Sequence, residues 1–127
     1  MGKRIDREGP IHRSVLHWLR LVLPPENIIH ACANESHLPG KHAMRATVKK
    51  KAAGQVTGFP DLLILPQAKV GAFFFEIKAE GGRLSQAQKA VHEGLRELGY
   101  PVAVVRSIED AREALIEFGV GFREAGK

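Results

Sequence analysis

Hydrophobic residues near the N-terminus of this chain recur at the spacing of a helix. They fall three or four positions apart, which places them on one side of a helix that can pack against a core. The residues at this spacing are Ile11, Val15, Trp18, Leu19 and Val22. Pro10 suits the first turn, Pro24 and Pro25 would end the helix, and residues 27–33 then predict a short strand.

The middle of the chain consists of a polar, basic stretch followed by two apolar runs. Residues 34–58 are polar, contain glycines and are rich in Lys and Arg, and the alanines and lysines of residues 42–53 allow a short helix. Residues 62–65 form one apolar run, and residues 72–77 form a second that Glu76 alone interrupts; their length and phenylalanines favour strands. We expect the polar residues 67–70 to connect these two strands.

The spacing of two acidic residues around this connection predicts how the strands pair. Asp61 and Glu76 stand at equal distances from its midpoint, so an antiparallel hairpin would bring Asp61 beside Glu76. Side chains alternate along a strand, which would place Glu76 and Lys78 on one face of the sheet. The other face, which can pack under a helix, would carry Phe73, Phe75 and Ile77.

Helical spacing returns in the last third of the chain. One apolar stripe is formed by Leu84, Ala87, Val91, Leu95 and Leu98. Ser85 and Gln88 have the spacing of a capping box at the start of this helix, and Gly99 supplies its stop. Residues 102–105 predict a buried strand, and residues 107–119 predict a final helix with an N-terminal serine cap and a glycine stop.

These elements predict a single α/β domain over residues 1–127, in the order α-β-(α)-β-β-α-β-α, with a central mixed sheet flanked by helices. Residues 1–8 are polar, and we expect them to be frayed. The 127 residues are 44% hydrophobic and 26% charged, which is ordinary for a globular domain that forms a core without disulfides or structural metals. Cys32 is the only cysteine, which excludes an internal disulfide and a cysteine-rich zinc cluster.

The charge balance points to an anionic partner. Lys and Arg number 19 against 14 Asp and Glu, which gives a net charge of +5 at pH 7 and favours nucleic acid among the anionic partners. The N-terminal residues carry no secretory signal, and no apolar run is long enough to span a bilayer. We therefore expect no membrane partner and a cytoplasmic protein of bacterial or phage origin, or a nuclear one in a eukaryote.

Asp61, Glu76 and Lys78 are the strongest candidates for chemistry. Adjacent carboxylates repel each other, and Mg²⁺, which prefers oxygen ligands, would relieve that repulsion. Such an ion can hold a phosphodiester and activate a water, with Lys78 orienting the water or stabilising the phosphorus centre. The alternative is a structural Glu76–Lys78 pair at a strand end, with Asp61 as a turn residue. The convergence of all three in a basic protein favours the catalytic interpretation.

These residues also resemble a known nuclease motif. The order Gly58-Phe59-Pro60-Asp61, then fourteen residues, then Glu76-Ile77-Lys78 resembles the PD-(D/E)xK phosphodiesterase motif. Further segments are similar to the virus-type replication-repair nuclease (VRR-NUC) family, and the resemblance runs from about residue 8 to residue 108. These segments are Asn34-Glu35, Phe75-Glu76-Ile77-Lys78-Ala79, Gly82-Arg83-Leu84-Ser85 with Gln88, Leu98-Gly99-Tyr100-Pro101-Val102, and Arg106-Ser107.

The resemblance implies a restriction-endonuclease-like core and a nuclease activity that depends on Mg²⁺ or Mn²⁺. Asp61 and Glu76 match the metal-binding acids of the family, and the backbone carbonyl of Ile77 would be a third protein ligand. The family also tends to carry a glutamate near the start of its first helix. Glu8 is the candidate for that position, although it stands before Gly9-Pro10.

The resemblance also implies catalytic roles, and it indicates that the basic residues contact nucleic acid. Lys78 matches the catalytic lysine, and Gln88 matches a glutamine on the following helix that faces the site, although Gln88 also suits the capping box. The residues expected to contact nucleic-acid phosphates are Arg45, Lys49, Lys50, Lys51 and Arg83. The histidines show no metal-ligand spacing, and His92 falls beside the apolar stripe of its helix, so no histidine-centred site is expected.

The leading interpretation is a Mg²⁺- or Mn²⁺-dependent endonuclease that acts on branched DNA, similar to the resolvases of four-way (Holliday) junctions in recombination and repair. Two symmetric cuts need two active sites, so we expect a homodimer, with the first helix or the apolar strand around Ile28 as the interface. A second interpretation is a nickase or flap nuclease that works with a helicase or repair partner. A third is a non-catalytic nucleic-acid-binding protein that keeps the fold.

Overall fold

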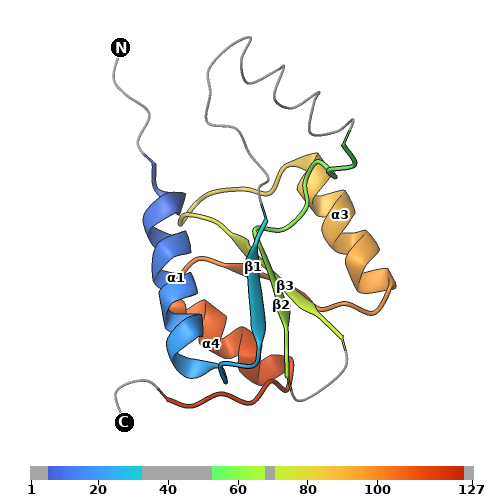
Figure 1. Ribbon diagram of the computed structural model, residues 1–127. Helices are drawn as coiled ribbons and strands as arrows, with labels where there is room; N and C mark the ends of the chain where they lie inside the picture. The colour runs from blue at the N-terminus through green and yellow to red at the C-terminus, as the bar shows by residue number, and fades with distance from the viewer. Residues whose placement is uncertain (1–5, 33–52, 68–70, 125–127) are drawn as a thin grey trace.

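The computed structural model describes residues 6–32, 53–67 and 71–124, and these form one sheet with helices on both faces (Figure 1). In chain order the elements are α1 (Glu8–Val22), β1 (Ile28–Ala31), β2 (Leu62–Leu65), β3 (Phe73–Ile77), α3 (Gln86–Glu97), β4 (Val102–Val105) and α4 (Ile108–Glu117). The predicted α/β class is confirmed. The short helix expected at residues 42–53 falls, except for position 53, outside the described residues.

The sheet is mixed, as predicted from the sequence. Its strands lie in the order β1-β2-β3-β4, with β1–β2 and β2–β3 antiparallel and β3–β4 parallel. Leu62 faces Phe75 across the β2–β3 hairpin, which is the register that the spacing of Asp61 and Glu76 predicted. α3 makes the crossover between the two parallel strands. None of the helices in the described ranges is long and apolar enough to cross a membrane.

The face of the sheet that α1 and α4 cover holds the hydrophobic core (Figure 1). Phe73, Phe75 and Ile77 project from β3 onto this face and are buried, as the alternation along the strand predicted. The helices contribute Val15, Trp18, Leu19, Val22, Ala111, Ala114 and Leu115. Trp18 therefore serves packing, because it lies inside this cluster and against the ring of Phe122.

α3 lies on the opposite face and buries much less apolar surface. Within α3, His92 is the residue that is fully buried. The stripe that indicated this helix is only half-buried, and Leu98 at its end is 75% exposed. The reason is that α3 turns the side bearing Gln88 and His92 toward Glu76 on β3, so polar contacts rather than the stripe set its orientation.

Local capping contacts fix the start of two helices, as the sequence predicted. Ser85 and Gln88 form a capping box before α3: Ser85 Oγ accepts from the Gln88 backbone N–H at 3.0 Å, and Gln88 Oε1 accepts from the Ser85 N–H at 2.9 Å. Ser107 caps α4 in the same way, with its hydroxyl accepting a backbone N–H of the helix at 3.0 Å. These contacts satisfy amides that the first turn leaves without partners.

The expectation that residues 1–8 are frayed was wrong for its last residues. α1 begins at Glu8, and the side chain of Asp6 accepts a hydrogen bond from the Gly9 backbone N–H at 2.8 Å. An acceptor at this position satisfies one of the unpaired amides of the first turn, which lets the helix start earlier than the polar sequence indicated. Residues 1–5 lie outside the described residues.

Candidate active site

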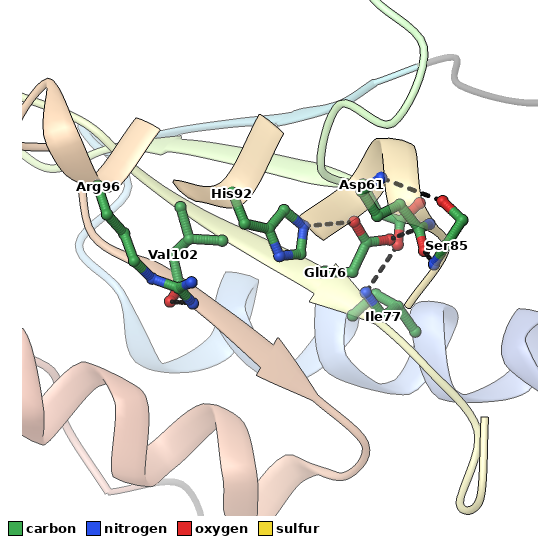
Figure 2. Close-up of polar contacts among 8 residues, drawn as sticks. Asp61, Glu76, Ile77, Ser85, His92, Arg96 and Val102 are labelled. Carbon is green, nitrogen blue, oxygen red and sulfur yellow. Dashed lines mark hydrogen bonds and ion pairs between the residues drawn. The ribbon is translucent and has the colours of Figure 1, made fainter. Parts of the chain in front are cut away.

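Asp61 and Glu76 lie together at one end of the β2–β3 hairpin (Figure 2). Asp61 directly precedes β2, and its Oδ2 accepts a hydrogen bond from the Ile77 backbone N–H at 2.7 Å. The backbone carbonyl of Asp61 accepts from the Cys32 N–H at 2.8 Å, which joins it to the end of β1. Asp61 is therefore held on both sides, with its carboxyl group directed at the end of β3.

Glu76 is a buried carboxyl group with only 1% of its surface exposed. Its pKa is raised from 4.5 to about 9, mainly by burial and then by a hydrogen bond with Asp61 and by the charge of Asp61. The charge of Lys78 opposes this shift, and the charge of Glu8 adds to it. Without a cation, Glu76 is therefore protonated at neutral pH, because a second negative charge beside Asp61 is unfavourable at this buried position.

Two side chains of α3 hold the carboxyl group of Glu76. His92 Nε2 lies 2.9 Å from Glu76 Oε1 (Figure 2), and Gln88 Nε2 donates to Glu76 Oε2 at 3.2 Å. The capping box directs the Gln88 amide, since its Oε1 is occupied by the Ser85 N–H and its Nε2 is left to face Glu76. Gln88 thus makes both contacts that the sequence left as alternatives, the cap and the contact at the site.

His92 is the site residue that the sequence reasoning missed. Its side chain is buried, and burial lowers its pKa, with a smaller contribution from the charge of Arg96, so the ring is neutral. The signal that identifies it is its spacing from Gln88: residues four positions apart share one face of a helix. The apolar stripe on the neighbouring face obscured this pair.

Gly58 allows the segment before Asp61 to pass directly against the start of α3. Its φ is +88°, a conformation that glycine adopts without strain. A Cβ at this position would lie 2.5 Å from the carbonyl carbon of Ala87 and 2.8 Å from the backbone nitrogen of Gln88. Non-bonded atoms do not approach this closely, so Gly58 sets how near α3 comes to the segment that carries Asp61.

Lys78 and the backbone of Ile77 complete the group at the end of β3. The Lys78 backbone N–H donates to the Val105 carbonyl at 3.1 Å, so this residue continues the pairing with β4. Its side chain is half-buried, and its charge acts on the Glu76 carboxyl. The N–H of Ile77 points at Asp61, and since the N–H and C=O of one strand residue point the same way, the Ile77 carbonyl faces the Asp61 side as well.

These oxygens fit a divalent cation of the magnesium type. Mg²⁺ is commonly bound through one or two carboxylates, with waters and substrate phosphates filling the remaining positions. Among the described residues no group of three or more Asp, Glu, His or Cys side chains is arranged to hold a metal. Asp61 and Glu76, with the Ile77 carbonyl as an additional oxygen, thus form a donor set suited to a cation that keeps part of its water shell.

The other predicted site residues lie around this pair or outside the described part of the chain. Glu8 is exposed in the first turn of α1, near enough for its charge to affect the pKa of Glu76. Arg83 is exposed in the segment between β3 and α3. The remaining basic candidates, Arg45, Lys49, Lys50 and Lys51, lie outside the described residues.

Comparisons with known proteins agree with this fold. The family model described as the VRR-NUC domain matches residues 6–109. A solved structure described as a "VRR_NUC domain protein" shares the fold, with a TM-score of 0.61 and 21% identity over 91% of this chain and 89% of that one. No curated protein matches the sequence. Because the family match spans most of the chain and includes Asp61, Glu76 and Lys78, the chain belongs to the VRR-NUC family of nuclease domains.

Proposed function

We propose that this chain is a Mg²⁺- or Mn²⁺-dependent endonuclease that hydrolyses phosphodiester bonds in branched DNA, in the manner of a four-way junction resolvase. The observation that carries the proposal is the Asp61–Glu76 pair. The Glu76 carboxyl is buried, its pKa is raised to about 9, and it is held by contacts from α3. Such strong perturbation by burial and by a second carboxyl group is typical of functional sites, and a divalent cation would relieve it.

The chain's own residues supply distinct parts of the chemistry. When a cation is bound at Asp61, Glu76 and the Ile77 carbonyl, it supplies polarisation of the phosphate and a more acidic bound water. Lys78 donates from Nζ to the attacking water or to a non-bridging phosphate oxygen, where its charge offsets the negative charge that develops at phosphorus. Glu8, at the start of α1, would reach the cation through a water.

Basic residues near the acidic pair would hold the DNA backbone. Arg83 is exposed just before α3, on the chain segment that links Lys78 to the capping box. We propose that it contacts a phosphate that flanks the scissile bond, together with Arg45 and the lysines at positions 49–51. Contacts of this kind position the protein on a nucleic acid without reading its sequence, so substrate shape would determine specificity.

Paired cuts across a junction require two active sites, and each chain carries one Asp61–Glu76 pair, so we propose a homodimer. β1 is an edge strand of the sheet, and Ile28 on it is 59% exposed, which supports this edge as the interface. A DNA substrate would place the protein in the cytoplasm of a bacterium or in the nucleus of a eukaryote.

The decisive experiment compares cleavage of a mobile four-way junction, a flap, a plain duplex and a single strand in Mg²⁺, Mn²⁺ or EDTA. We expect metal-dependent cutting of the junction. Asp61→Asn should abolish cutting, while an amide oxygen at this position still accepts from the Ile77 N–H and preserves the fold. Lys78→Ala should slow cutting by about 10²–10³-fold. DNA binding in EDTA should persist in both variants.

Matched controls are available on the exposed ends of two helices. Glu97→Gln removes a carboxylate at the far end of α3, and Arg20→Ala removes a positive charge in the last turn of α1, and both should cut at the native rate. Native-rate cutting by Asp61→Asn would reject the site. Preference for flaps, or nicking that requires a helicase, would favour the second interpretation, and binding without cutting in either metal would favour a non-catalytic role. Paired junction cuts by a protein that light scattering shows to be monomeric would reject the dimer.

A further inference from the structure

We propose that His92 is a positioning residue of the nuclease site, which fixes the Glu76 carboxyl group in the orientation that binds the catalytic cation. This inference rests on the proposed metal-dependent function. His92 would not touch the cation or the DNA. It would act through Glu76, by holding one carboxyl oxygen against α3 so that the remaining acceptor positions face Asp61.

Each oxygen of the Glu76 carboxyl group has a contact with a side chain of α3. His92 Nε2 lies 2.9 Å from Oε1 (Figure 2). Gln88 Nε2 lies 3.2 Å from Oε2. A carboxylate offers about four acceptor positions, two on each oxygen, so each contact leaves one position on its oxygen. Asp61 lies beside this carboxyl group, since its hydrogen bond and its charge both raise the pKa of Glu76. The shorter of the two contacts from α3, and hence the stronger constraint, comes from His92.

The burial of both partners makes this contact a fixed one. Glu76 and His92 are each 1% exposed, and they come from different elements, β3 and α3. Water therefore does not compete for the contact, and rotation of either side chain would leave a buried polar group without a partner, which is unfavourable. The hydrogen bond thus ties the carboxyl orientation to the position of the helix.

The second nitrogen of His92 argues against a purely structural role. Among the described residues, His92 Nδ1 is a buried side-chain atom for which the structure shows no hydrogen-bond partner. An apolar side chain of similar size would fill the same space without a buried, unpartnered nitrogen. The feature that distinguishes histidine from such a residue here is the Nε2 contact with Glu76. Hydrogen bonds to metal-binding carboxylates orient them and raise metal affinity, which gives this contact its function.

The test measures Mn²⁺ binding in the absence of DNA, by titration calorimetry, on the full chain. A glutamine amide nitrogen reaches the position of Nε2, whereas the shorter asparagine places its amide near Nδ1. His92→Asn should therefore weaken Mn²⁺ binding by about 10–100-fold, and His92→Gln should stay within about threefold of the native protein. Val91→Ala, a half-buried neighbour on the same helix, serves as the packing control and should bind Mn²⁺ normally.

The outcomes separate this inference from the proposed function. If native protein binds Mn²⁺ and Asp61→Asn does not, while folded His92→Asn binds as native, the positioning role is overturned and the function stands. Equal losses in His92→Asn and His92→Gln also overturn it. If native protein and Asp61→Asn both fail to bind, both proposals fail. Thermal melts without metal verify folding, and His92→Leu, which lacks the donor but keeps apolar bulk, replaces His92→Asn if that variant does not fold.

Discussion

The two faces of strand β3 serve different purposes, although every residue of the strand is buried. On one face, Phe73, Phe75 and Ile77 pack into the core formed with α1 and α4. On the other, Phe74 packs beside Phe59 and Tyr100, and Glu76 meets two polar side chains of α3. A single strand therefore carries the stability of the domain on one side and its candidate chemistry on the other.

The difference shows that burial has opposite consequences on the two faces. Removing an aromatic ring from water stabilises the fold, whereas removing a carboxyl group from water destabilises it unless that group is protonated or bound to a cation. The α3 face thus keeps a residue that costs stability in the metal-free protein. Substitutions on the two faces of β3 should accordingly change stability in opposite directions, and this is the basis of the following predictions.

The largest effect should follow from the apolar face. Phe75→Ala removes a fully buried ring from the core, and we expect the free energy of unfolding to fall by about 3–5 kcal/mol. Urea denaturation at constant pH measures this loss. Metal binding per folded molecule should be nearly unchanged, because Phe75 points away from Glu76. A loss below about 1 kcal/mol would show that this face does not dominate stability.

An effect of comparable size and opposite sign is expected for Glu76→Gln. The pKa of Glu76 is raised from 4.5 to about 9 in the fold, so its stabilising, protonated state is fully present below pH 4.5 and is lost as the pH rises toward 9. Glutamine stays neutral throughout. At pH 8 without metal, the variant should therefore be more stable than the native protein, by on the order of 4–5 kcal/mol.

The pH dependence provides the control for this prediction. The stability difference between Glu76→Gln and the native protein should shrink toward zero near pH 5, because Glu76 is then protonated in the folded protein and increasingly so in the unfolded one. Thermal melts at pH 5, 6.5 and 8, each in EDTA, measure the trend. A difference that does not change with pH would contradict the assigned perturbation of Glu76. The variant should also lose Mn²⁺ binding, whereas Phe75→Ala should keep it.

The smallest effect is expected for Arg83, which precedes α3, and it concerns DNA affinity rather than stability. Arg83 is exposed, so its loss should leave stability unchanged and remove one phosphate contact. In Arg83→Ala, the slope of log affinity for junction DNA against log salt concentration should fall by about one. Fluorescence anisotropy in EDTA at several salt concentrations measures the slope. Arg20→Ala, at the end of α1, should leave this slope at the native value. An equal change of slope in both variants would contradict a specific phosphate contact at Arg83.

Much of the fold could be predicted because its signals are local in the sequence. The hairpin register followed from the symmetric positions of Asp61 and Glu76 about a polar connection, and the alternation of side chains along β3 then gave the two faces. The start of α3 followed from the spacing of Ser85 and Gln88, and its end from Gly99, which adopts a φ of +94°. Each signal involves residues within one turn, one hairpin or one strand.

The parts that could not be predicted depend on how distant elements pack. The apolar stripe of α3 does not reveal that His92, together with Gln88, meets a carboxyl group on another element. The close approach of Gly58 to the backbone of α3 also joins segments about thirty positions apart, and no local pattern reveals it. His92 was missed for this reason, since a histidine beside an apolar stripe carries no signal of its partner.

The small apolar contact between α3 and the sheet affects how the domain opens locally. α3 contributes little apolar burial, and its side facing the sheet meets Glu76 through two hydrogen bonds, whereas α1 and α4 are fastened by a continuous apolar core. Segments with few buried apolar contacts open at lower free energy than the rest of a protein. In native-state hydrogen exchange, the amides of α3 should therefore exchange through an opening that leaves β3 and α4 protected. We therefore expect the helix beside the candidate site to open before the rest of the domain, and a cation bound at Glu76 would oppose that opening.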